Sequence, residues 1–214
     1  AIIGSTGSGK SSILNLIPRF YDVTSGQVLF DGVDVRDMNR ADLRSRIGYV
    51  PQRAVLFQGT LRENLCYGDH TADDVQLWEA VEIAQAKAFV EEKGGLDCEV
   101  ARGGANFSGG QKQRLSIARA VVRRPEVYLF DDSFSALDYK TDAALRRRLS
   151  DITADAAVII VAQRVSTVMN ADCILVLDDE GNIAGKGRHQ ELLQNCSVYR
   201  EIVTSQLSAE EAGL

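Results

Sequence analysis

The sequence lacks the features of a membrane-spanning segment and of a nucleic-acid-binding protein. Its longest apolar runs, residues 156–162 and 173–177, fall far short of the roughly 18 residues that a spanning helix needs. Its formal net charge is −6, and no basic run is long enough to form a nucleic-acid footprint. We therefore expect no direct bilayer crossing by this segment and no binding to nucleic acid.

Cysteine and histidine are few and scattered. The four cysteines are Cys66, Cys98, Cys173 and Cys196. None forms a C-x-x-C pair, so we expect reduced, partly buried thiols of a cytosolic protein and no zinc site. His70 and His189 have no ligand-like residues nearby in the sequence, which leaves metal binding through imidazole without support.

The start of the chain is also unusual for what it does not contain. There is no initiator methionine and no signal peptide. Only Ala1, Ile2 and Ile3 precede a glycine-rich loop, whereas a strand before such a loop usually has about five or six residues. We therefore expect a fragment whose fold is truncated at its N-terminus.

What remains is the composition of an ordinary globular protein, with 45% hydrophobic and 25% charged residues. Apolar runs and helical periods alternate along it. The predicted strands are residues 28–30, 47–50, 127–130, 157–161 and 174–177. The predicted helices are residues 11–19, 111–124 and 190–207, with a turn at 178–182. Residues 61–111 favour helices without a strong strand, so we expect a helical insertion in an α/β fold whose sheet is mostly parallel and buried.

Residues 4–11 fit the phosphate-loop pattern G-x-x-x-x-G-K-[ST], with an apolar strand before them and a helix after. The glycines let backbone N–H groups converge on a phosphate, and the helix adds its positive end. Lys10 supplies a charge to the β- and γ-phosphates, and the Ser11 hydroxyl is placed to ligate Mg²⁺. The predicted ATP-binding residues are Gly4, Ser5, Thr6, Gly7, Ser8, Gly9, Lys10, Ser11 and Ser12. This context disfavours a plain glycine-rich turn.

A phosphate loop needs a second metal-orienting acid at the end of a neighbouring strand. The apolar run that begins at Val127 ends at Asp131 and supplies one. We assign Asp131 this Walker B role, although a strand ending in two acids could by itself be a capped loop.

A further segment carries a specific resemblance. Residues 107–120 run Phe-Ser-Gly-Gly-Gln-Lys-Gln-Arg-Leu-Ser-Ile-Ala-Arg-Ala and closely resemble the signature motif of ABC transporter ATPases. Gln52 resembles the Q-loop glutamine of that family, and Ser135-Ala136-Leu137-Asp138 resemble its D-loop. Residues 19–21 and 60–64 are similar to the exporter branch, in which the ATPase is fused behind a transmembrane domain.

This resemblance implies a P-loop NTPase of RecA-like type with the ABC ATPase fold, and ATP and Mg²⁺ as cofactors. It implies Ser11, Gln52 and Asp131 as Mg²⁺ ligands, and Gln52 as a catalytic residue as well. It divides the chain into four parts. These are residues 1–60, the first part of the core; 61–122, a helical subdomain ending in the signature helix; 123–188, the second part of the core; and 189–214, a C-terminal helix.

The resemblance also implies partners. In such exporters a head-to-tail dimer places each ATP between the phosphate loop of one subunit and the signature of the other. Ser108, Gly109, Gly110 and Gln111 begin a predicted helix, which makes a second anion-binding end suited to a partner's ATP. A transmembrane domain and an adenine-stacking aromatic residue would precede Ala1. The chain would then lie at the cytoplasmic face of the plasma (inner) membrane.

Two catalytic positions depart from the family pattern. Asp132 stands where a glutamate polarises the attacking water, and its carboxylate is one methylene shorter. Gln163 stands where the family has a switch histidine, and glutamine cannot carry a positive charge or shuttle a proton. Residues 101–103, Ala-Arg-Gly, also replace the usual Gly-Glu-Arg, which affects the expected contact to the transmembrane domain.

Three interpretations follow. The first is one half of a heterodimeric exporter whose own site binds Mg-ATP and hydrolyses it slowly, while its intact signature completes the partner's site. The second is a homodimeric, fully hydrolysing ABC ATPase in which Asp132 and Gln163 suffice. The third is a nucleotide-gated interaction module that dimerises on ATP without turning it over.

Overall fold

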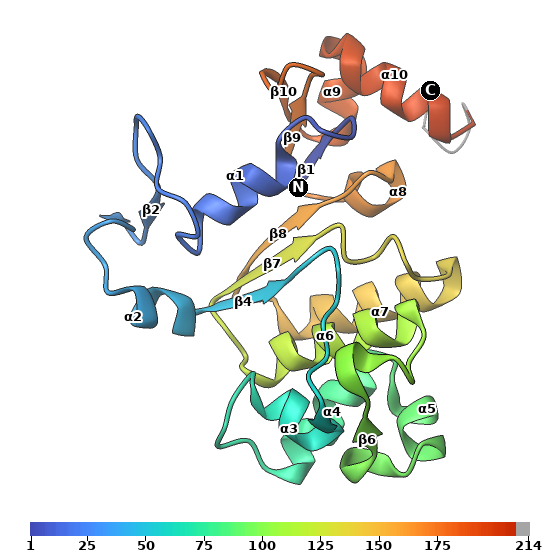
Figure 1. Ribbon diagram of the computed structural model, residues 1–214. Coiled ribbons are helices and arrows are strands. Elements are labelled where there is room, and N and C mark those ends of the chain that lie inside the picture. Colours follow the sequence, from blue (N-terminus) through green and yellow to red (C-terminus); the bar gives the residue numbers. More distant parts are fainter. Residues whose placement is uncertain (209–214) are drawn as a thin grey trace. The chain divides into compact units, whose positions relative to one another are not determined.

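The computed structural model describes residues 1–208, and the chain divides into two compact units. Unit 1 comprises residues 1–43, 130–135 and the C-terminal part from 159 onward, and unit 2 comprises residues 44–129 and 136–158. Figure 1 shows the elements in sequence order by colour. The predicted division into four parts remains a proposal.

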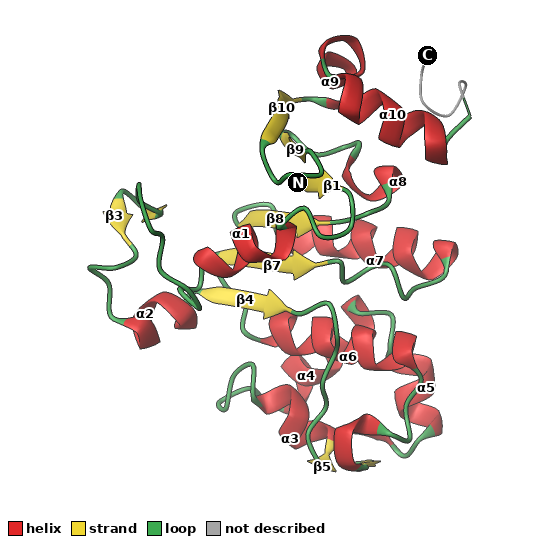
Figure 2. Cartoon of the chain, turned by 45° about the horizontal axis from the view of Figure 1, so that its top comes forward, coloured by secondary structure: helices red, strands yellow, loops and turns green. Residues whose placement is uncertain are grey.

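A mostly parallel sheet forms the core of the α/β fold, which confirms the predicted fold class (Figure 2). Its strands are hydrogen-bonded in the order β10-β9-β1-β8-β7-β4. Their bounds are β1 Ile2–Gly4, β4 Ile47–Val50, β7 Val127–Asp131, β8 Ala157–Val161, β9 Ile174–Leu177 and β10 Ile183–Gly187. β1 is parallel to β8 and to β9, and β10 is antiparallel to β9.

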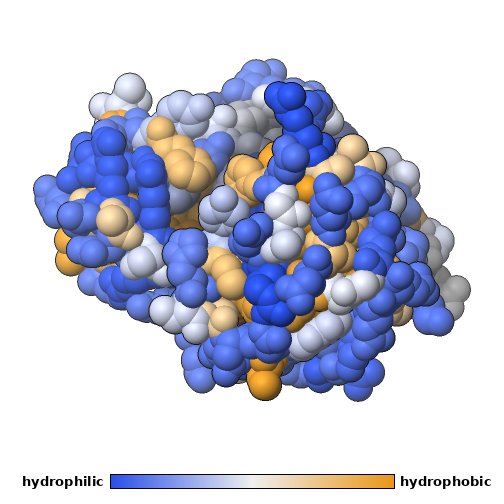
Figure 3. Space-filling model, turned by 60° about the horizontal axis from the view of Figure 1, so that its bottom comes forward, coloured by the Kyte–Doolittle hydropathy of each residue, from blue (hydrophilic) through white to orange (hydrophobic). Residues whose placement is uncertain are grey.

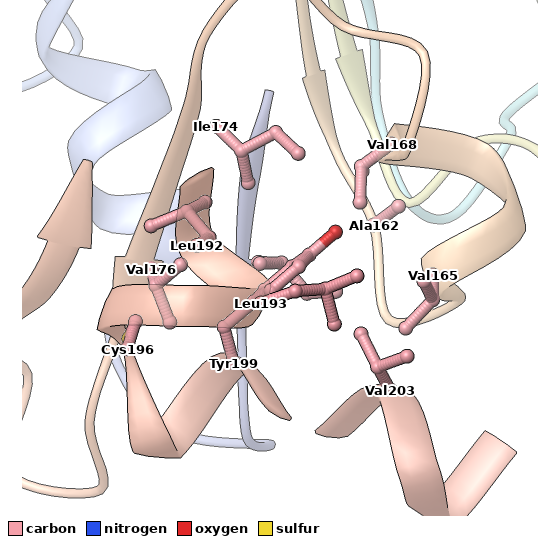
Figure 4. Packing of buried hydrophobic residues seen from close by; sticks show 11 residues of the cluster. Ala162, Val165, Val168, Ile174, Val176, Leu192, Leu193, Cys196, Tyr199 and Val203 are labelled. Carbon is pink, nitrogen blue, oxygen red and sulfur yellow. The ribbon is translucent and has the colours of Figure 1, made fainter. Parts of the chain in front are cut away.

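The hydrophobic core of unit 1 packs helices against β1 and β9 (Figure 4). These helices are α8 Val165–Val168, α9 His189–Asn195 and α10 Ser197–Gln206. The buried cluster consists of Ile3, Ala162, Val165, Val168, Ile174, Val176, Leu192, Leu193, Cys196, Tyr199 and Val203. Each fully buried aliphatic side chain contributes about 1.5–3 kcal/mol relative to exposure, so this cluster anchors α10 firmly.

Unit 1 also contains α1 (Lys10–Leu16) and a two-stranded hairpin of β2 (Leu29–Phe30) and β3 (Val33–Asp34). Asp31 and Gly32 both have positive φ angles, of 49° and 81°. Two such residues favour the type I′ turn, whose twist matches paired strands. α2 (Arg40–Ser45) follows the hairpin.

Unit 2 is largely helical. Its helices are α3 Leu61–Cys66, α4 Asp74–Ile83, α5 Lys87–Glu92, α6 Gly109–Val122 and α7 Tyr139–Ile152, with short 3₁₀ turns at Gly95–Asp97 and Arg102–Gly104. Capping boxes begin α3, α4 and α6. The half-buried Arg119 of α6 donates to the Asn64 carbonyl at 2.8 Å and to the Asn64 side-chain oxygen at 3.0 Å, which ties α6 to α3. The predicted helical character of this region is confirmed.

Several predicted boundaries are wrong. The predicted helix 11–19 ends at Leu16, since Pro18 cannot donate a backbone bond and Arg19 has a φ of +55°. The predicted helix 190–207 is two helices, because Cys196 is extended between α9 and α10. Residues 209–214 of the predicted C-terminal part lie outside the described residues.

The predicted strands at 28–30, 47–50, 127–130, 157–161 and 174–177 are confirmed within a residue or two. Residues 157 and 158 of β8 are nevertheless exposed, contrary to the expected burial of that strand. β10 and the short pair β5 (Gly59–Thr60) and β6 (Glu99–Val100) were not predicted. Residues 183–187 contain two glycines and a lysine, and two-residue strands are too short to leave a pattern.

The surface mixes hydrophobic and hydrophilic residues, as the face in Figure 3 shows. Within residues 1–208, no helix is both long and apolar enough to span a membrane. All four cysteines are free; Cys98 and Cys196 are buried, whereas Cys173 is exposed.

Tyr199→Phe is expected to lower the free energy of unfolding by about 1–2 kcal/mol at pH 7. The buried Tyr199 hydroxyl lies 2.8 Å from His189 Nδ1, and the variant removes that partner from a buried histidine. Urea unfolding checks this, with Tyr21→Phe as the control because Tyr21 is 65% exposed.

The loss of stability in Tyr199→Phe should also depend on pH. Burial raises the pKa of Tyr199 to about 12, whereas an unfolded tyrosine titrates near ~10. Between these values the unfolded chain alone loses this proton, so the stability that Tyr199 contributes falls as pH rises from ~10 to ~12. The wild-type advantage over Tyr199→Phe should therefore shrink between pH 9 and pH 11. An equal advantage at both pH values contradicts the assignment.

Candidate functional site

The loop after β1 takes a shape that only glycine adopts readily at two positions. Gly7 and Gly9 have φ angles of 90° and 89°, and added Cβ atoms there would meet nothing within 4 Å. Backbone conformation, not crowding, therefore requires glycine at both positions. Gly4 differs, because a Cβ there would lie 2.7 Å from the Leu177 carbonyl oxygen. The loop thus leaves the sheet in close contact with β9.

Lys10, the first residue of α1, is buried inside this loop. Its ammonium group donates to the Gly4 carbonyl at 2.8 Å, to the Ser5 carbonyl, and to Ser8 Oγ at 3.3 Å. Burial lowers the pKa of Lys10, while the charges of Asp132 and Asp131 act to raise it. The loop therefore encloses one cation whose three donors point at its own oxygen atoms.

Ser11 and Asp131 meet beside this lysine, although 120 positions separate them in the sequence. Ser11 Oγ donates to Asp131 Oδ1 at 2.7 Å, and Asp131 ends β7 with only 5% of its surface exposed. A hydroxyl and a carboxylate are hard oxygen ligands of the kind that Mg²⁺ takes. These residues therefore fit a Mg²⁺ ion bound with a nucleotide.

Asp132 follows in an uncommon backbone conformation, with φ at +44°. Aspartate is one of the few residues enriched in this left-handed region. Its N–H donates to the Val161 carbonyl at 2.8 Å, and its Oδ2 accepts from Gln163 Nε2 at 3.2 Å. The structure thus brings together Asp132 and Gln163, the two residues that we expect to depart from the family pattern.

The segment around Gln163 is held by further contacts that the sequence did not predict. Arg164 donates to the Ser135 carbonyl at 3.0 Å, and Ser135 Oγ donates to the Asp132 carbonyl at 2.8 Å. The side chain of Gln206, at the end of α10, contacts the backbone of this segment on the other side. No sequence pattern links a glutamine 43 positions away to Gln163.

The remaining predicted site residues belong mainly to unit 2. Gln52 is exposed in the loop after β4. Ser108 caps α6 through a reciprocal pair with Gln111: the Gln111 N–H donates to Ser108 Oγ at 3.3 Å, and the Ser108 N–H donates to Gln111 Oε1 at 2.9 Å. Gly109 and Gly110 open that helix. Their roles toward a nucleotide remain predictions.

The D-loop residues are divided between the two units. Ser135 lies in unit 1, and Ala136, Leu137 and Asp138 lie in unit 2. Asp138 caps α7 by accepting from the Thr141 N–H at 3.0 Å. This contact fixes Asp138 at the start of α7 within unit 2.

A pocket of about 360 Å³ adjoins the phosphate loop in unit 1. It is lined by the start of that loop, by Gln163, by the turn after β9 and by one face of α10. An added Cβ at Gly181 of that turn would lie 3.2 Å from the Ser8 carbonyl oxygen, so the turn packs closely on the loop. The loop, the segment at Gln163 and α10 therefore border one space.

Comparison with known proteins identifies similar proteins in one family. The profile of the family described as ABC transporter matches residues 1–135. An uncharacterized ABC transporter ATP-binding protein of Mycobacterium tuberculosis is 51% identical over 218 aligned positions, covering 100% of this chain and 37% of that protein. A putative multidrug export ATP-binding/permease protein of Staphylococcus aureus is 42% identical over 207 positions, covering 96% and 36%.

A solved structure is also similar. The structure of a bacterial Atm1-family ABC exporter with ATP bound superposes with a TM-score of 0.92 at 37% identity, covering 97% of this chain and 36% of that chain. The chain thus spans a little over a third of the length of the relatives that it matches.

Gly9→Ala is expected to lower the free energy of unfolding by about 1–2 kcal/mol, because alanine is strained at a φ of 89°. Gly109→Ala is the matched control, since Gly109 opens α6 with helical backbone and open space around its Cα. Alanine there should be neutral or slightly stabilising. Urea unfolding without nucleotide compares the two, and equal losses would show that backbone strain is not the cause.

Proposed function

The chain belongs to the ABC transporter family, and from that premise we propose that it is the ATP-binding domain of an exporter subunit that couples Mg-ATP binding and hydrolysis to transport. ATP-binding domains of this family are generally ATPases. The observation that carries the proposal is the 2.7 Å contact between Ser11 and Asp131 beside a lysine enclosed by a glycine loop. This arrangement joins a phosphate-binding loop to a pair of metal-binding oxygen atoms.

Each residue has a definite task in this proposal. The loop from Gly4 to Ser12 binds the phosphates. The Lys10 ammonium group gives up one of its three hydrogen bonds to loop oxygen atoms and donates to a phosphate oxygen instead. Ser11, Asp131 and Gln52 hold Mg²⁺, which when bound neutralises the charge of the phosphates. Asp132 orients the water, and Gln163 donates a hydrogen bond at the γ-phosphate.

We further propose that this site is the slow one of an asymmetric pair. Asp132 is 8% exposed, and its carboxylate accepts a bond from the Gln163 amide. A carboxylate that is one methylene shorter reaches less far toward an attacking water, and a neutral amide adds no positive charge in the transition state. The intact signature, Ser108 to Gln111, would serve a partner's ATP.

The proposed partner is a second ABC half-transporter subunit, in a head-to-tail dimer of ATP-binding domains. The Staphylococcus aureus relative is named for both an ATP-binding and a permease part, and this chain matches about a third of it. We therefore propose a transmembrane domain in the same parent protein. The ATP-binding domain would then lie at the cytoplasmic face of the plasma (inner) membrane.

Lys10→Ala in the transporter that contains this chain is expected to weaken Mg-ATP binding at this site by about tenfold or more. The substitution removes a charged donor from the phosphate loop. Lys186→Ala is the matched control, since it removes the same charge from the exposed surface of unit 1. Equilibrium binding of a fluorescent ATP analogue compares them, and equal affinities would remove the basis of the proposed function.

Asp132→Glu combined with Gln163→His is expected to raise single-turnover hydrolysis at this site by about tenfold or more, because a longer carboxylate reaches the attacking water and an imidazole can carry positive charge at the γ-phosphate. Asp172→Glu, an exposed change of the same kind in unit 1, should have no effect.

Two results would contradict a slow site. Brisk hydrolysis by the unsubstituted protein that the double change leaves unaltered favours a homodimer in which aspartate and glutamine suffice. No product from any variant favours a nucleotide-gated module that never hydrolyses ATP.

A further inference from the structure

We propose that Gln206 is a positioning residue for the nucleotide site, which holds the backbone on both sides of Arg164 so that Gln163 reaches Asp132. This inference rests on the proposed function, because it concerns the residues assigned to hydrolysis. It adds a residue from the C-terminal helix that neither the motifs nor the family profile, which ends at residue 135, includes.

Gln206 holds a short segment, residues 162–165, at the surface of the hydrophobic cluster, which we call the arch. Ala162 and Val165 are 4% and 0% exposed and belong to the hydrophobic cluster of unit 1 (Figure 4). Gln163 and Arg164, between them, are exposed. The arch is therefore fixed at its two ends by burial, while the peptide groups at its top need polar partners.

The Gln206 amide supplies both kinds of partner at once. Its Nε2 donates to the Gln163 carbonyl oxygen at 2.8 Å, and its Oε1 accepts from the Val165 N–H at 2.9 Å. Of the twenty common side chains, only glutamine and asparagine offer a donor and an acceptor side by side in one planar group. Asparagine is one methylene shorter, so it would not reach both atoms from the same helix position.

The helix that carries Gln206 is a rigid support. Tyr199 and Val203, about two turns and one turn before it, are both 0% exposed in the same cluster as Val165. Gln206 is the last residue of α10 and contributes nothing to that burial. Its side chain therefore links α10 to the arch only through its two hydrogen bonds, which fix the arch relative to α10.

The arch in turn positions the side chains of Gln163 and Arg164. Gln163 Nε2 donates to Asp132 Oδ2 at 3.2 Å, and Arg164 donates to the carbonyl of Ser135 at 3.0 Å. Without the Gln206 side chain, the peptide groups of Gln163 and Val165 can rotate toward water. The long Gln163 side chain then no longer lies within hydrogen-bonding distance of Asp132. The hydrogen bonds of Lys10 and Ser11 go to Gly4, Ser5, Ser8 and Asp131 and not to Gln206, so ATP binding should not depend on the Gln206 side chain.

Gln206→Ala in the intact transporter tests this inference. Alanine has a higher helix propensity than glutamine, so the variant keeps α10 and removes only the two bonds. Hydrogen exchange of the Val165 amide should become about tenfold faster, as expected when one hydrogen bond is lost. Single-turnover hydrolysis at the site built on Lys10 should fall by about fivefold, with ATP affinity unchanged within twofold. Thr204→Ala, at an exposed position of α10 that does not line the pocket beside the phosphate loop, should change none of these.

A double-mutant cycle separates positioning from general weakening. In a Gln163→Ala background, Gln206→Ala should have no further effect on hydrolysis, because the side chain that it positions is gone. Gln206→Glu gives a second route, since it keeps the acceptor for the Val165 N–H but replaces the donor to the Gln163 carbonyl. This variant should reduce hydrolysis while leaving Val165 exchange nearly unchanged.

The inference is overturned by unchanged Val165 exchange in Gln206→Ala, by unchanged hydrolysis, or by an equal loss of hydrolysis in the Gln163→Ala background. Failure of the proposed function looks different. It would appear as ATP binding that does not depend on Lys10, whereas the exchange of the Val165 amide would still report the two bonds of Gln206.

Discussion

The parallel pairing of β1 with β8 on one side and β9 on the other is the constraint on which the site depends. Ile2 pairs with Val161 and with Leu175, so a strand of three residues is held along both edges. Its end at Gly4 places the loop at the carboxyl edge of the sheet, where Asp131 ends β7 and Gln163 follows β8. Parallel strands gather their carboxyl ends at one edge, which is where α/β proteins bind ligands.

At that edge, the backbone conformation limits which residues can stand at several positions. Gly7 and Gly9 take left-handed conformations in the loop, and Asp132 takes one directly after Asp131. Aspartate tolerates that conformation better than most residues, so the shorter acid is compatible with the local backbone. The same residue is bonded to the Gln163 amide. A hydrogen bond therefore joins the two positions at which we expect the chain to depart from the family pattern.

The sequence was sufficient for the elements with strong patterns. The strand ending at Asp131 and the loop ending at Lys10 follow from apolar runs and from glycine spacing, and the structure has both. The contact between Ser11 and Asp131 spans 120 residues, so it could be expected only from knowledge of the motif pair. Strand β10 was missed because residues 183–187 lack an apolar run. The break at Cys196 was missed because apolar residues continue on both sides of it.

Other features have no local signal at all. The sequence does not indicate that Lys10 bonds to the carbonyls of its own loop. That contact depends on how the loop closes in three dimensions. Gln206 ends a helix 43 residues after Gln163 and looks like any exposed polar residue. Long-range polar contacts of this kind are decided by tertiary packing, which periodicity does not encode.

The central claim is that the site built on Lys10, Asp131 and Asp132 binds Mg-ATP but hydrolyses it slowly beside a faster partner site. The most direct measurement is the identity of the nucleotide bound to the purified transporter, separated rapidly from free nucleotide during steady-state turnover. Asymmetry predicts that one of the two bound nucleotides remains ATP while the other cycles to ADP. Conversion of both bound nucleotides to ADP at the same rate would contradict it.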